Sequence, residues 1–322
     1  MHCSLFIPDF FSTESASIGD RLAAAETLIA RGRRKRGPPV SQEAWLFARF
    51  GVQRQGDWPV APYTLLADGG APEHRFWMRA DPVHLSVGSG NLGLARPTLD
   101  VSRSEAEALV ETLNHHFGEA AVFSWLQPER WYVRLERAPA LRTTSPYAAR
   151  GRTIGHELPS GADAMRFHSM MNEAQMLLHE HRVNTQREAR GASAVNSVWF
   201  WGGGVLETPR LRPCSIVLAE GALARGLALA ADLPQRRLPA NAATTLPGLP
   251  EDGTILIVFD SPRHAALERD WFEPLRAALE DGRIGMLSLY LAGGNSMLEV
   301  ETVRSDLRYF WRTRKRLETY LA

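Results

Sequence analysis

The chain has 322 residues, and its 37 Lys and Arg residues face 36 Asp and Glu residues, so the formal net charge is +1. This balance argues against a dedicated nucleic-acid binder and against a polybasic membrane-surface protein, because both carry a large basic excess. The hydrophobic fraction of 44% is ordinary for a globular protein, and the length suggests about two domains.

No stretch approaches the roughly 18 uninterrupted apolar residues that span a membrane. The N-terminus has neither the basic region nor the long apolar run of a signal peptide. The two cysteines, Cys3 and Cys214, form no CxxC pair, which excludes a zinc ribbon or a thioredoxin-like motif. We therefore expect a cytoplasmic protein.

The first part of the chain alternates apolar runs with helical patterns. Ser17 and Ser41 are the expected N-caps of its two helices. The expected elements are a buried strand at 3–11, a helix at 17–31, a basic loop at 33–36, a helix at 41–50 and a strand at 59–66.

The order of the expected elements changes in the next part of the chain. Ser102 and Glu105 form the pattern of a capping box at the start of a helix that runs to Phe117. The surrounding strands are expected at 75–87, 91–95, 121–126 and 131–136, the last two forming a hairpin. This order predicts a small inserted α+β domain over residues 74–140.

The remaining chain returns to apolar strands that alternate with helices. The expected strands lie at 195–201, 214–218, 254–259, 285–291 and 298–303, and the expected helices at 162–180, 221–231, 271–280 and 305–321. Such strands indicate a parallel sheet covered on both faces. The predicted fold class is therefore α/β, with a mostly parallel sheet built from residues 1–73 and 141–322.

In an open α/β sheet, binding sites gather at the carboxyl ends of the strands. Four features of the sequence fall there: Asp9, Ser41 at a helix N-terminus, the run Gly202–Gly204, and the pair Asp260 and His264. Three of them have a structural alternative. Ser41 would then be only an N-cap and the glycines a tight turn. Asp260 would be a loop cap and His264 a surface histidine.

The segment from His179 to Gly204 is the most specific part of the sequence. Its pattern is carried by His181, Val183, Asn184, Arg187, Gly191, Asn196, Trp199, Gly202 and Gly204. It resembles the archaeal-type cofactor-independent phosphoglycerate mutases. The chain is most similar to a bacterial branch, the RpfE-type regulatory proteins, which share the runs Trp77–Leu85, Arg130–Tyr132 and Phe310–Arg312.

The resemblance implies an alkaline-phosphatase-like core that holds two divalent metals, such as Mn, Zn or Mg, beside a serine nucleophile. Ser41 falls on the nucleophile, and Asp9, Asp260 and His264 fall on metal ligands. In such a site two cations clamp the attacking and leaving oxygens, and one lowers the pKa of the serine.

The sequence departs from the family pattern at several of these positions. The glycine expected after Asp9 is missing, and Gln42 stands where the family has an aspartate beside the serine. A late Asp-His pair falls on residues 293–296, which contain neither residue type. Three protein ligands hold one metal but hardly two. We therefore predict a catalytically degenerate family member.

The resemblance assigns Asn184, Arg187 and Asn196 to a substrate pocket. Arg187 would then form a bidentate fork on a phosphate or carboxylate. In the structural alternative, the two asparagines satisfy buried backbone groups and Arg187 pairs with a buried acid. The sequence leaves both alternatives open.

Three functions remain. The first is a regulatory protein that binds a small phosphorylated or carboxylated ligand, or a protein partner. The second is an active metal-dependent phosphomutase or phosphatase that uses Ser41. The third is a structural interaction module whose pocket is filled by side chains such as Trp45 or Trp201.

The C-terminal run Arg308–Arg316 mixes arginines with aromatic residues. Such a run stacks on single-stranded nucleic acid in some proteins. The near-neutral total charge instead favours an amphipathic terminal helix that packs its aromatic residues on the core. We expect neither nucleic acid nor membrane as a partner.

Overall fold

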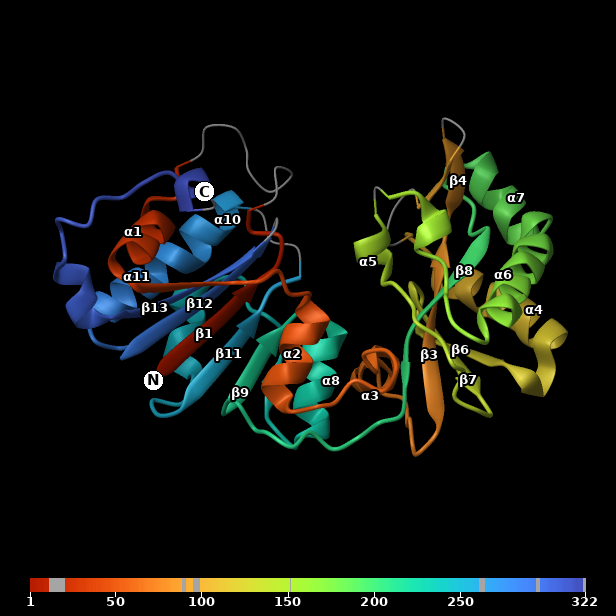
Figure 1. Ribbon diagram of the computed structural model, residues 1–322, viewed down its shortest axis with the longest axis horizontal. Coiled ribbons are helices and arrows are strands. Elements are labelled where there is room, and N and C mark those ends of the chain that lie inside the picture. Colours follow the sequence, from red (N-terminus) through yellow and green to blue (C-terminus); the bar gives the residue numbers. More distant parts are fainter. Residues whose placement is uncertain are drawn as a thin grey trace. The chain divides into compact units, whose positions relative to one another are not determined.

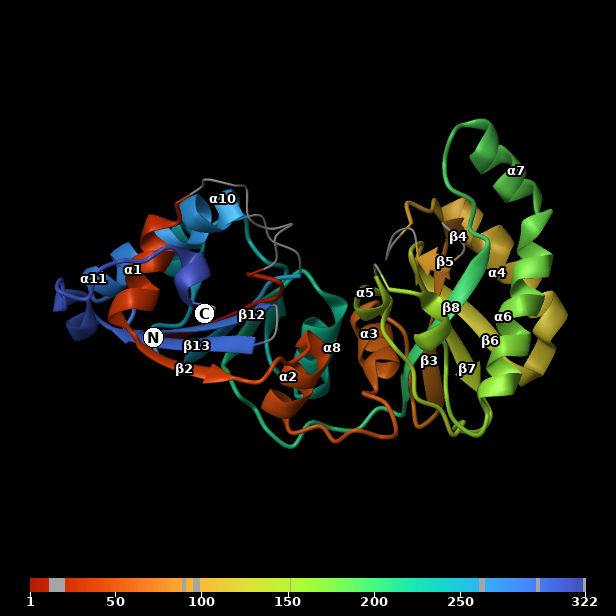
Figure 2. The ribbon, with the colours of Figure 1, turned by 45° about the horizontal axis from the view of Figure 1, so that its top comes forward.

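The computed structural model describes residues 1–11, 21–88, 91–94, 99–150, 152–260, 264–293 and 296–320. The chain divides into two compact units (Figures 1 and 2). Unit 1 consists of Met1–Val52 and Pro209–Ala322, and unit 2 consists of Gln53–Thr208.

Unit 1 is built on a seven-stranded sheet in the order β10-β9-β11-β1-β12-β13-β2. Its strands are β1 (His2–Ile7), β2 (Arg33–Gly37), β9 (Ile216–Ala219), β10 (Gln235–Arg236), β11 (Thr254–Val258), β12 (Met286–Gly293) and β13 (Ser296–Val303). The central strand β1 pairs in parallel with β11 and β12, and only β13 and β2 run antiparallel to their neighbours. The predicted α/β fold class, with a mostly parallel sheet covered by helices, is confirmed.

Helices cover both faces of this sheet (Figure 1). They are α1 (Ala23–Arg31), α2 (Gln42–Phe50), α8 (Ala222–Ala230), α9 (Ala242–Thr245), α10 (His264–Leu267) and α11 (Glu273–Glu280). On one face, α1 and α11 form the main core with Leu5 and Ile7 of β1. On the other face, α2 places Trp45 with its ring centroid 4.5 Å from that of Phe6. Successive side chains of β1 point to opposite faces of the sheet, so β1 contributes to the hydrophobic packing on both faces.

Residues 33–36 form strand β2, so the predicted basic loop is wrong. The strand pairs with β13 in a register that sets Lys35 opposite Glu299 and Arg33 opposite Glu301. Opposite charges across a strand pair stabilise it, and exposed cations are typical of sheet edges. No apolar alternation marks such a strand in the sequence.

Unit 2 contains a four-stranded antiparallel sheet in the order β6-β7-β3-β8 and a two-stranded sheet of β4 and β5. The strands are β3 (Phe76–Val83), β4 (Leu85–Gly88), β5 (Asn91–Leu94), β6 (Val122–Gln127), β7 (Arg130–Leu135) and β8 (Ser197–Gly204). The helices are α3 (Val60–Ala67), α4 (Arg103–Phe117), α5 (Pro146–Ala149), α6 (Ala164–His179) and α7 (Arg182–Ala189).

The predicted capping box of α4 is confirmed. The Ser102 hydroxyl accepts from the Glu105 backbone N–H at 3.4 Å, and the Glu105 carboxylate accepts from the Ser102 N–H at 2.7 Å. This reciprocal pair satisfies two backbone donors that the first turn of a helix leaves open. The expected N-cap Ser17 of the first helix lies outside the described residues.

Unit 2 is larger than the insertion expected at 74–140. The reason is that β8, expected in the parallel core, pairs antiparallel with β3, and α3 and α6 pack on β8. The stretch 59–66, expected as a strand, forms α3. Its residues Val60–Leu65 are all buried, so neither a helical nor a strand period is visible in the sequence.

The predicted C-terminal helix is absent from the described residues. Short 3₁₀ turns at Arg304–Arg308 and Leu317–Tyr320 flank a segment without regular structure. Phe310 and Trp311 are 76% and 61% exposed, so the predicted packing of these aromatic residues on the core is wrong. Consecutive residues of a helix point about 100° apart, so adjacent aromatic side chains do not share one face.

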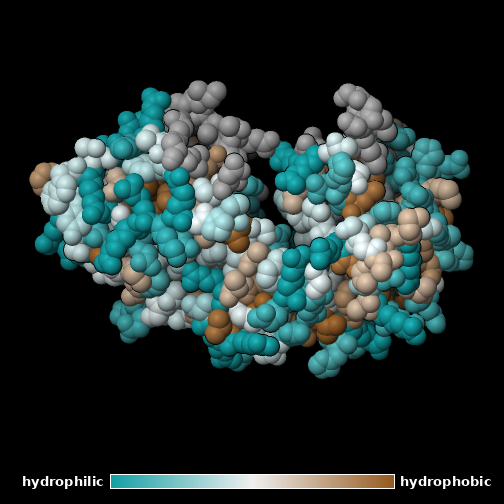
Figure 3. All heavy atoms as spheres, in the orientation of Figure 1, coloured by the Kyte–Doolittle hydropathy of each residue, from teal (hydrophilic) through white to brown (hydrophobic). Residues whose placement is uncertain are grey.

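The surface is predominantly hydrophilic on the face drawn in Figure 3, where hydrophobic residues lie scattered in small groups. Within the described ranges, no helix is both long enough and apolar enough to cross a membrane.

Two glycines at the ends of β2 provide a matched test of how β2 packs against β13. A Cβ at Gly32 would lie 2.8 Å from the Glu301 carbonyl oxygen, whereas a Cβ at Gly37 meets nothing within 4 Å. We expect Gly32→Ala to lower the free energy of unfolding by about 1–3 kcal/mol through overpacking, and Gly37→Ala to leave it nearly unchanged. Urea unfolding measures both, and equal midpoints for the two variants would contradict the packing described.

Candidate functional site

The carboxyl edge of the sheet in unit 1 collects the predicted catalytic and metal-binding residues. Asp9 follows β1 and Asp260 follows β11. Helices α2 and α8 begin nearby, with Ser41 and Gly221 as their N-caps. Helix N-termini favour negative charge, so this edge has the character of an anion or metal-carboxylate site.

The Asp260 carboxylate is bound by a residue at the start of α2 and lies close to the start of α8. The Gln42 side-chain amide donates to its Oδ1 at 3.2 Å. A Cβ on Gly221 would lie 2.5 Å from the same oxygen, so the carboxylate lies directly against the N-terminus of α8. Gly221 has no side chain to cap the helix, and the nearby negative charge is favourable there. Asp260 thus stabilises this edge from within the protein.

Ser41 is the N-cap of α2, and its Oγ accepts from the Ala44 backbone N–H at 3.2 Å. The residue is exposed. Among the described residues its side chain makes no other hydrogen bond. Ser41 is thus an N-cap, as the structural alternative expects, and its role as a nucleophile stays a prediction.

Asp9 and His264 are positioned differently from each other. Asp9 is exposed and adopts a left-handed backbone conformation with φ 49°. His264 is only 6% exposed, and its Nε2 donates to the Phe10 carbonyl at 2.6 Å. A carbonyl oxygen only accepts, so the proton is on Nε2 and only Nδ1 keeps a lone pair. The alternative of a surface histidine is therefore wrong.

The donors that the structure describes at this edge do not form a two-metal centre. Within the described parts of the chain, no three His, Cys, Asp or Glu side chains are grouped so that they could hold a metal ion. The expected ligand set of Asp9, Asp260 and His264 is therefore not brought together. Asp260 accepts from Gln42 and His264 is bound to Phe10, so both are engaged inside the protein.

The motif residues of the predicted substrate pocket lie in unit 2. Asn184 is 1% exposed, and its amide donates to the backbone carbonyls of Leu178 and Val195 at 2.7 and 2.8 Å. Its Oδ1 accepts from the Val195 N–H at 2.8 Å. The side chain therefore ties the end of α6 to the segment that leads into β8.

Arg187 and Asn196 have similar structural roles. Arg187 is 2% exposed and donates to Glu105 at 2.9 Å and to the Ser193 carbonyl at 2.8 Å. Asn196 exchanges two hydrogen bonds of 2.8 Å with the backbone of Leu85. These partners are the ones that the structural alternative expects for Asn184, Arg187 and Asn196, and the substrate-binding assignment of the three residues stays a prediction.

The run Gly202–Gly204 forms the end of β8, so the tight turn expected there is wrong. A Cβ on Gly203 would lie 2.8 Å from the Phe76 ring and 2.9 Å from Met78. The backbone of Gly203 approaches these side chains of the neighbouring strand too closely to leave room for a side chain of its own.

Sequence reasoning missed a buried polar pair within unit 2. Arg79 donates to Asp81 at 3.0 Å, and Trp201 Nε1 donates to the other Asp81 oxygen at 2.7 Å. Burial raises the pKa of Asp81, and the Arg79 charge opposes that shift. Both charged residues lie in the run Trp77–Leu85, which is part of the family resemblance. This run was the signal in the sequence that could have pointed to the pair.

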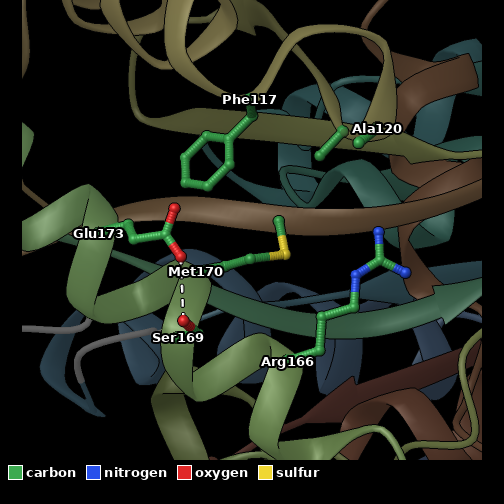
Figure 4. A pocket seen from close by; sticks show the side chains of 7 residues that line it. Phe117, Ala120, Arg166, Ser169, Met170 and Glu173 are labelled. Atoms are coloured by element: carbon green, nitrogen blue, oxygen red, sulfur yellow. Dashed lines mark hydrogen bonds between the residues drawn. The ribbon is translucent and has the colours of Figure 1, made fainter.

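A hollow of about 340 Å³ lies between the end of α4 and α6 in unit 2 (Figure 4). It is lined by Phe117, Ala120, Ala121, Arg166, Ser169, Met170 and Glu173. Ser169 donates to Glu173 at 3.0 Å beside it. None of the predicted site residues lines this hollow.

The fold and these sites define an α/β protein with a mostly parallel sheet in one unit and an antiparallel sheet in the other. No protein-family model matches the chain. A 2,3-bisphosphoglycerate-independent phosphoglycerate mutase of Methanothrix thermoacetophila is 39% identical over 61 residues, which are 19% of this chain and 16% of that protein. The match thus spans a small part of this relative.

Two solved structures are similar along most of their length. The PH0037 protein from Pyrococcus horikoshii has a TM-score of 0.54 at 13% identity, with 94% of this chain and 87% of that chain covered. The cofactor-independent phosphoglycerate mutase from Thermoplasma acidophilum has a TM-score of 0.46 at 15% identity, with coverages of 98% and 94%. The likeness to the Pyrococcus protein shows a shared fold, and the 61-residue match shows a local sequence similarity to a phosphoglycerate mutase.

Asn184 provides the test of its structural role. Asn184→Ala removes the partner of the Val195 N–H and carbonyl, at roughly 1–3 kcal/mol each, whereas the Leu178 carbonyl keeps the His181 N–H, so we expect the free energy of unfolding to fall by about 2 kcal/mol or more. The exposed Asn172 of α6 is the matched control, and Asn172→Ala is expected to have little effect. Denaturant unfolding without ligand measures both. Equal stability of the two variants would return Asn184 to a ligand-binding role.

The ion pair of Glu105 predicts a pH dependence of stability. Burial raises the pKa of Glu105, but hydrogen bonds from Ser102 and the cations Arg190 and Arg187 outweigh it, so the pKa lies below its ordinary value of 4.5. A lowered pKa in the folded state adds stability above pH 4.5, and this stability is lost as the pH falls through the folded-state pKa.

We therefore expect Glu105→Gln to be less stable than the wild type at pH 7 and the difference to shrink steadily below pH 4.5. Urea unfolding from pH 7 to pH 3 measures this, with the exposed Glu107→Gln as control. A difference that stays constant over this range would show that the Glu105 charge contributes nothing.

Proposed function

We propose that this protein is a phosphoglycerate-mutase-like protein of the alkaline-phosphatase-like fold that has lost two-metal phosphoryl transfer. The local sequence match and the α/β fold support the relationship. The observation that carries the loss of activity is the hydrogen bond from Gln42 to Asp260.

The chemistry of this contact explains the loss. By resemblance to the family, an aspartate stands beside the nucleophile where this chain has Gln42. A second carboxylate there would repel Asp260 unless a cation lay between them. The Gln42 amide donates directly to Asp260 and removes the need for the cation. Loss of one metal clamp costs several kcal/mol of transition-state stabilisation, or roughly a thousandfold in rate.

His264 supports the same proposal. Its Nε2 proton is bound to the Phe10 carbonyl, and its ring centroid lies 4.9 Å from that of Phe10. The imidazole therefore serves the packing of the turn after β1. Ser41 has no base beside it among the described residues.

The proposed role is regulatory, as in the RpfE-type proteins that the sequence resembles. The protein acts by binding a small phosphorylated or carboxylated ligand or a protein partner. The proposal does not assign these contacts to Asn184, Arg187 and Asn196, whose polar atoms bind other parts of unit 2.

An active phosphomutase or phosphatase remains the second candidate. The observation in its favour is the exposed Ser41 hydroxyl at the N-terminus of α2, where the helix dipole favours a bound phosphate. The two candidates differ in their response to metal.

A phosphatase assay with a generic phosphomonoester and added Mn²⁺, Zn²⁺ or Mg²⁺ separates them. We expect no metal-dependent turnover by the wild type and no change in Ser41→Ala. The matched control is Ser145→Ala, which removes the N-cap of α5. Metal-dependent turnover that Ser41→Ala abolishes and Ser145→Ala retains would overturn the proposal.

A further inference from the structure

The basic residues are unevenly distributed along the chain. Eleven of the 37 lie in two short segments, residues 31–37 and 304–316, which contain a single acidic residue, Asp306. Both lysines of the protein are among them. The remaining 26 basic residues face 35 acidic ones. Glu299 and Glu301 face Lys35 and Arg33 across β13 and β2, so the near-zero total charge hides a local excess that is strongest in residues 304–316.

The structure of unit 1 joins these two segments. Arg31 donates to the Leu307 carbonyl at 2.6 Å, and Arg312 donates back to the Arg31 carbonyl at 2.9 Å. Arg36 donates to the Tyr320 carbonyl at 2.6 Å. We call residues 33–36 and 308–316 the basic-aromatic surface. Its second part follows β13 in dark blue in Figure 1.

Most of the cations of the second segment have no acidic partner among the side chains that the structure describes. Arg308, Arg314, Lys315 and Arg316 are exposed, and none forms a salt bridge with an acidic side chain that the structure describes. Asp306 is buried and accepts from the Val303 backbone N–H at 3.0 Å. The positive charge of this segment is thus largely available to an external anion.

Two large aromatic side chains lie among these cations. Phe310 and Trp311 are 76% and 61% exposed, with ring centroids 5.3 Å apart and planes at 82°. Tyr309 contacts Trp311 at 5.2 Å, and the Arg312 guanidinium lies 4.8 Å from the Tyr309 ring centroid. Exposed apolar side chains grouped in this way mark an interaction surface.

We propose that the basic-aromatic surface docks on an anionic lipid bilayer. Clustered arginines and lysines are attracted to anionic headgroups, and Trp and Phe side chains enter the interface between headgroups and acyl chains. The acidic excess of the remaining chain is repelled by the same bilayer. The charge distribution therefore orients unit 1 with this surface toward the lipid.

The ring geometry favours lipid over single-stranded nucleic acid. Bases stack on successive aromatic faces along a basic groove. Phe310 and Trp311 are nearly perpendicular to each other, so they do not form a continuous stacking platform. Insertion into a lipid interface makes no such demand on ring orientation. The surface contains neither Ser41 nor Asp260, and the proposal does not depend on the activity of that edge.

Co-sedimentation of the full chain with vesicles tests the proposal. The probes are phosphatidylcholine vesicles and vesicles in which about a third of the lipid is phosphatidylserine. We expect binding to the anionic vesicles only, with binding weakened by high salt because the attraction is partly electrostatic.

Two variants identify the surface. We expect the double variant Phe310→Ser, Trp311→Ser and the triple variant Arg314→Ser, Lys315→Ser, Arg316→Ser each to reduce anionic-vesicle binding at least about tenfold. The matched control is Met165→Ser, Met176→Ser, which removes side chains 77% and 73% exposed on α6. Circular dichroism confirms that each variant is folded.

Three results would overturn the proposal. The first is a wild type that stays in the supernatant with anionic vesicles. The second is unchanged binding by both test variants. The third is tighter binding of a single-stranded oligonucleotide than of anionic vesicles, which would assign the surface to nucleic acid.

Discussion

Polar groups at the ends of strands and helices must find partners when they are buried, and this constraint explains both candidate sites. In unit 1, Asp260 is satisfied by Gln42 and His264 by the Phe10 carbonyl. In unit 2, Asn184 and Arg187 satisfy backbone and carboxylate groups around the start of β8. Side chains that a motif assigns to a ligand are thus required by the fold itself.

The elements predicted correctly from the sequence are those whose signals are local. Strand β1 is a continuous apolar run, and α4 begins with the capping box of Ser102 and Glu105. The elements predicted wrongly depend on distant partners. Strand β2 exists because Glu299 and Glu301 face its cations, and β8 belongs to unit 2 because it pairs with β3. Neither partner is visible from the strand's own residues.

The same limit applies to the candidate site. A motif such as the one around Asn184 and Asn196 shows that particular residues belong together, but it does not show whether they face a ligand or the backbone. The departure at Gln42 was visible in the sequence, whereas its hydrogen bond to Asp260 required the fold. The total charge was an equally incomplete guide to function. A value of +1 does not show that cations are clustered next to Trp311.

The central claim is that the carboxyl edge of the sheet in unit 1 no longer holds a two-metal centre. Anomalous diffraction from crystals of the full chain grown with Mn²⁺ tests this most directly. We expect no pair of metal peaks beside Ser41 and an intact hydrogen bond between Gln42 and Asp260. Two peaks about 3.5–4 Å apart, ligated by Asp9 and Asp260, would contradict the account.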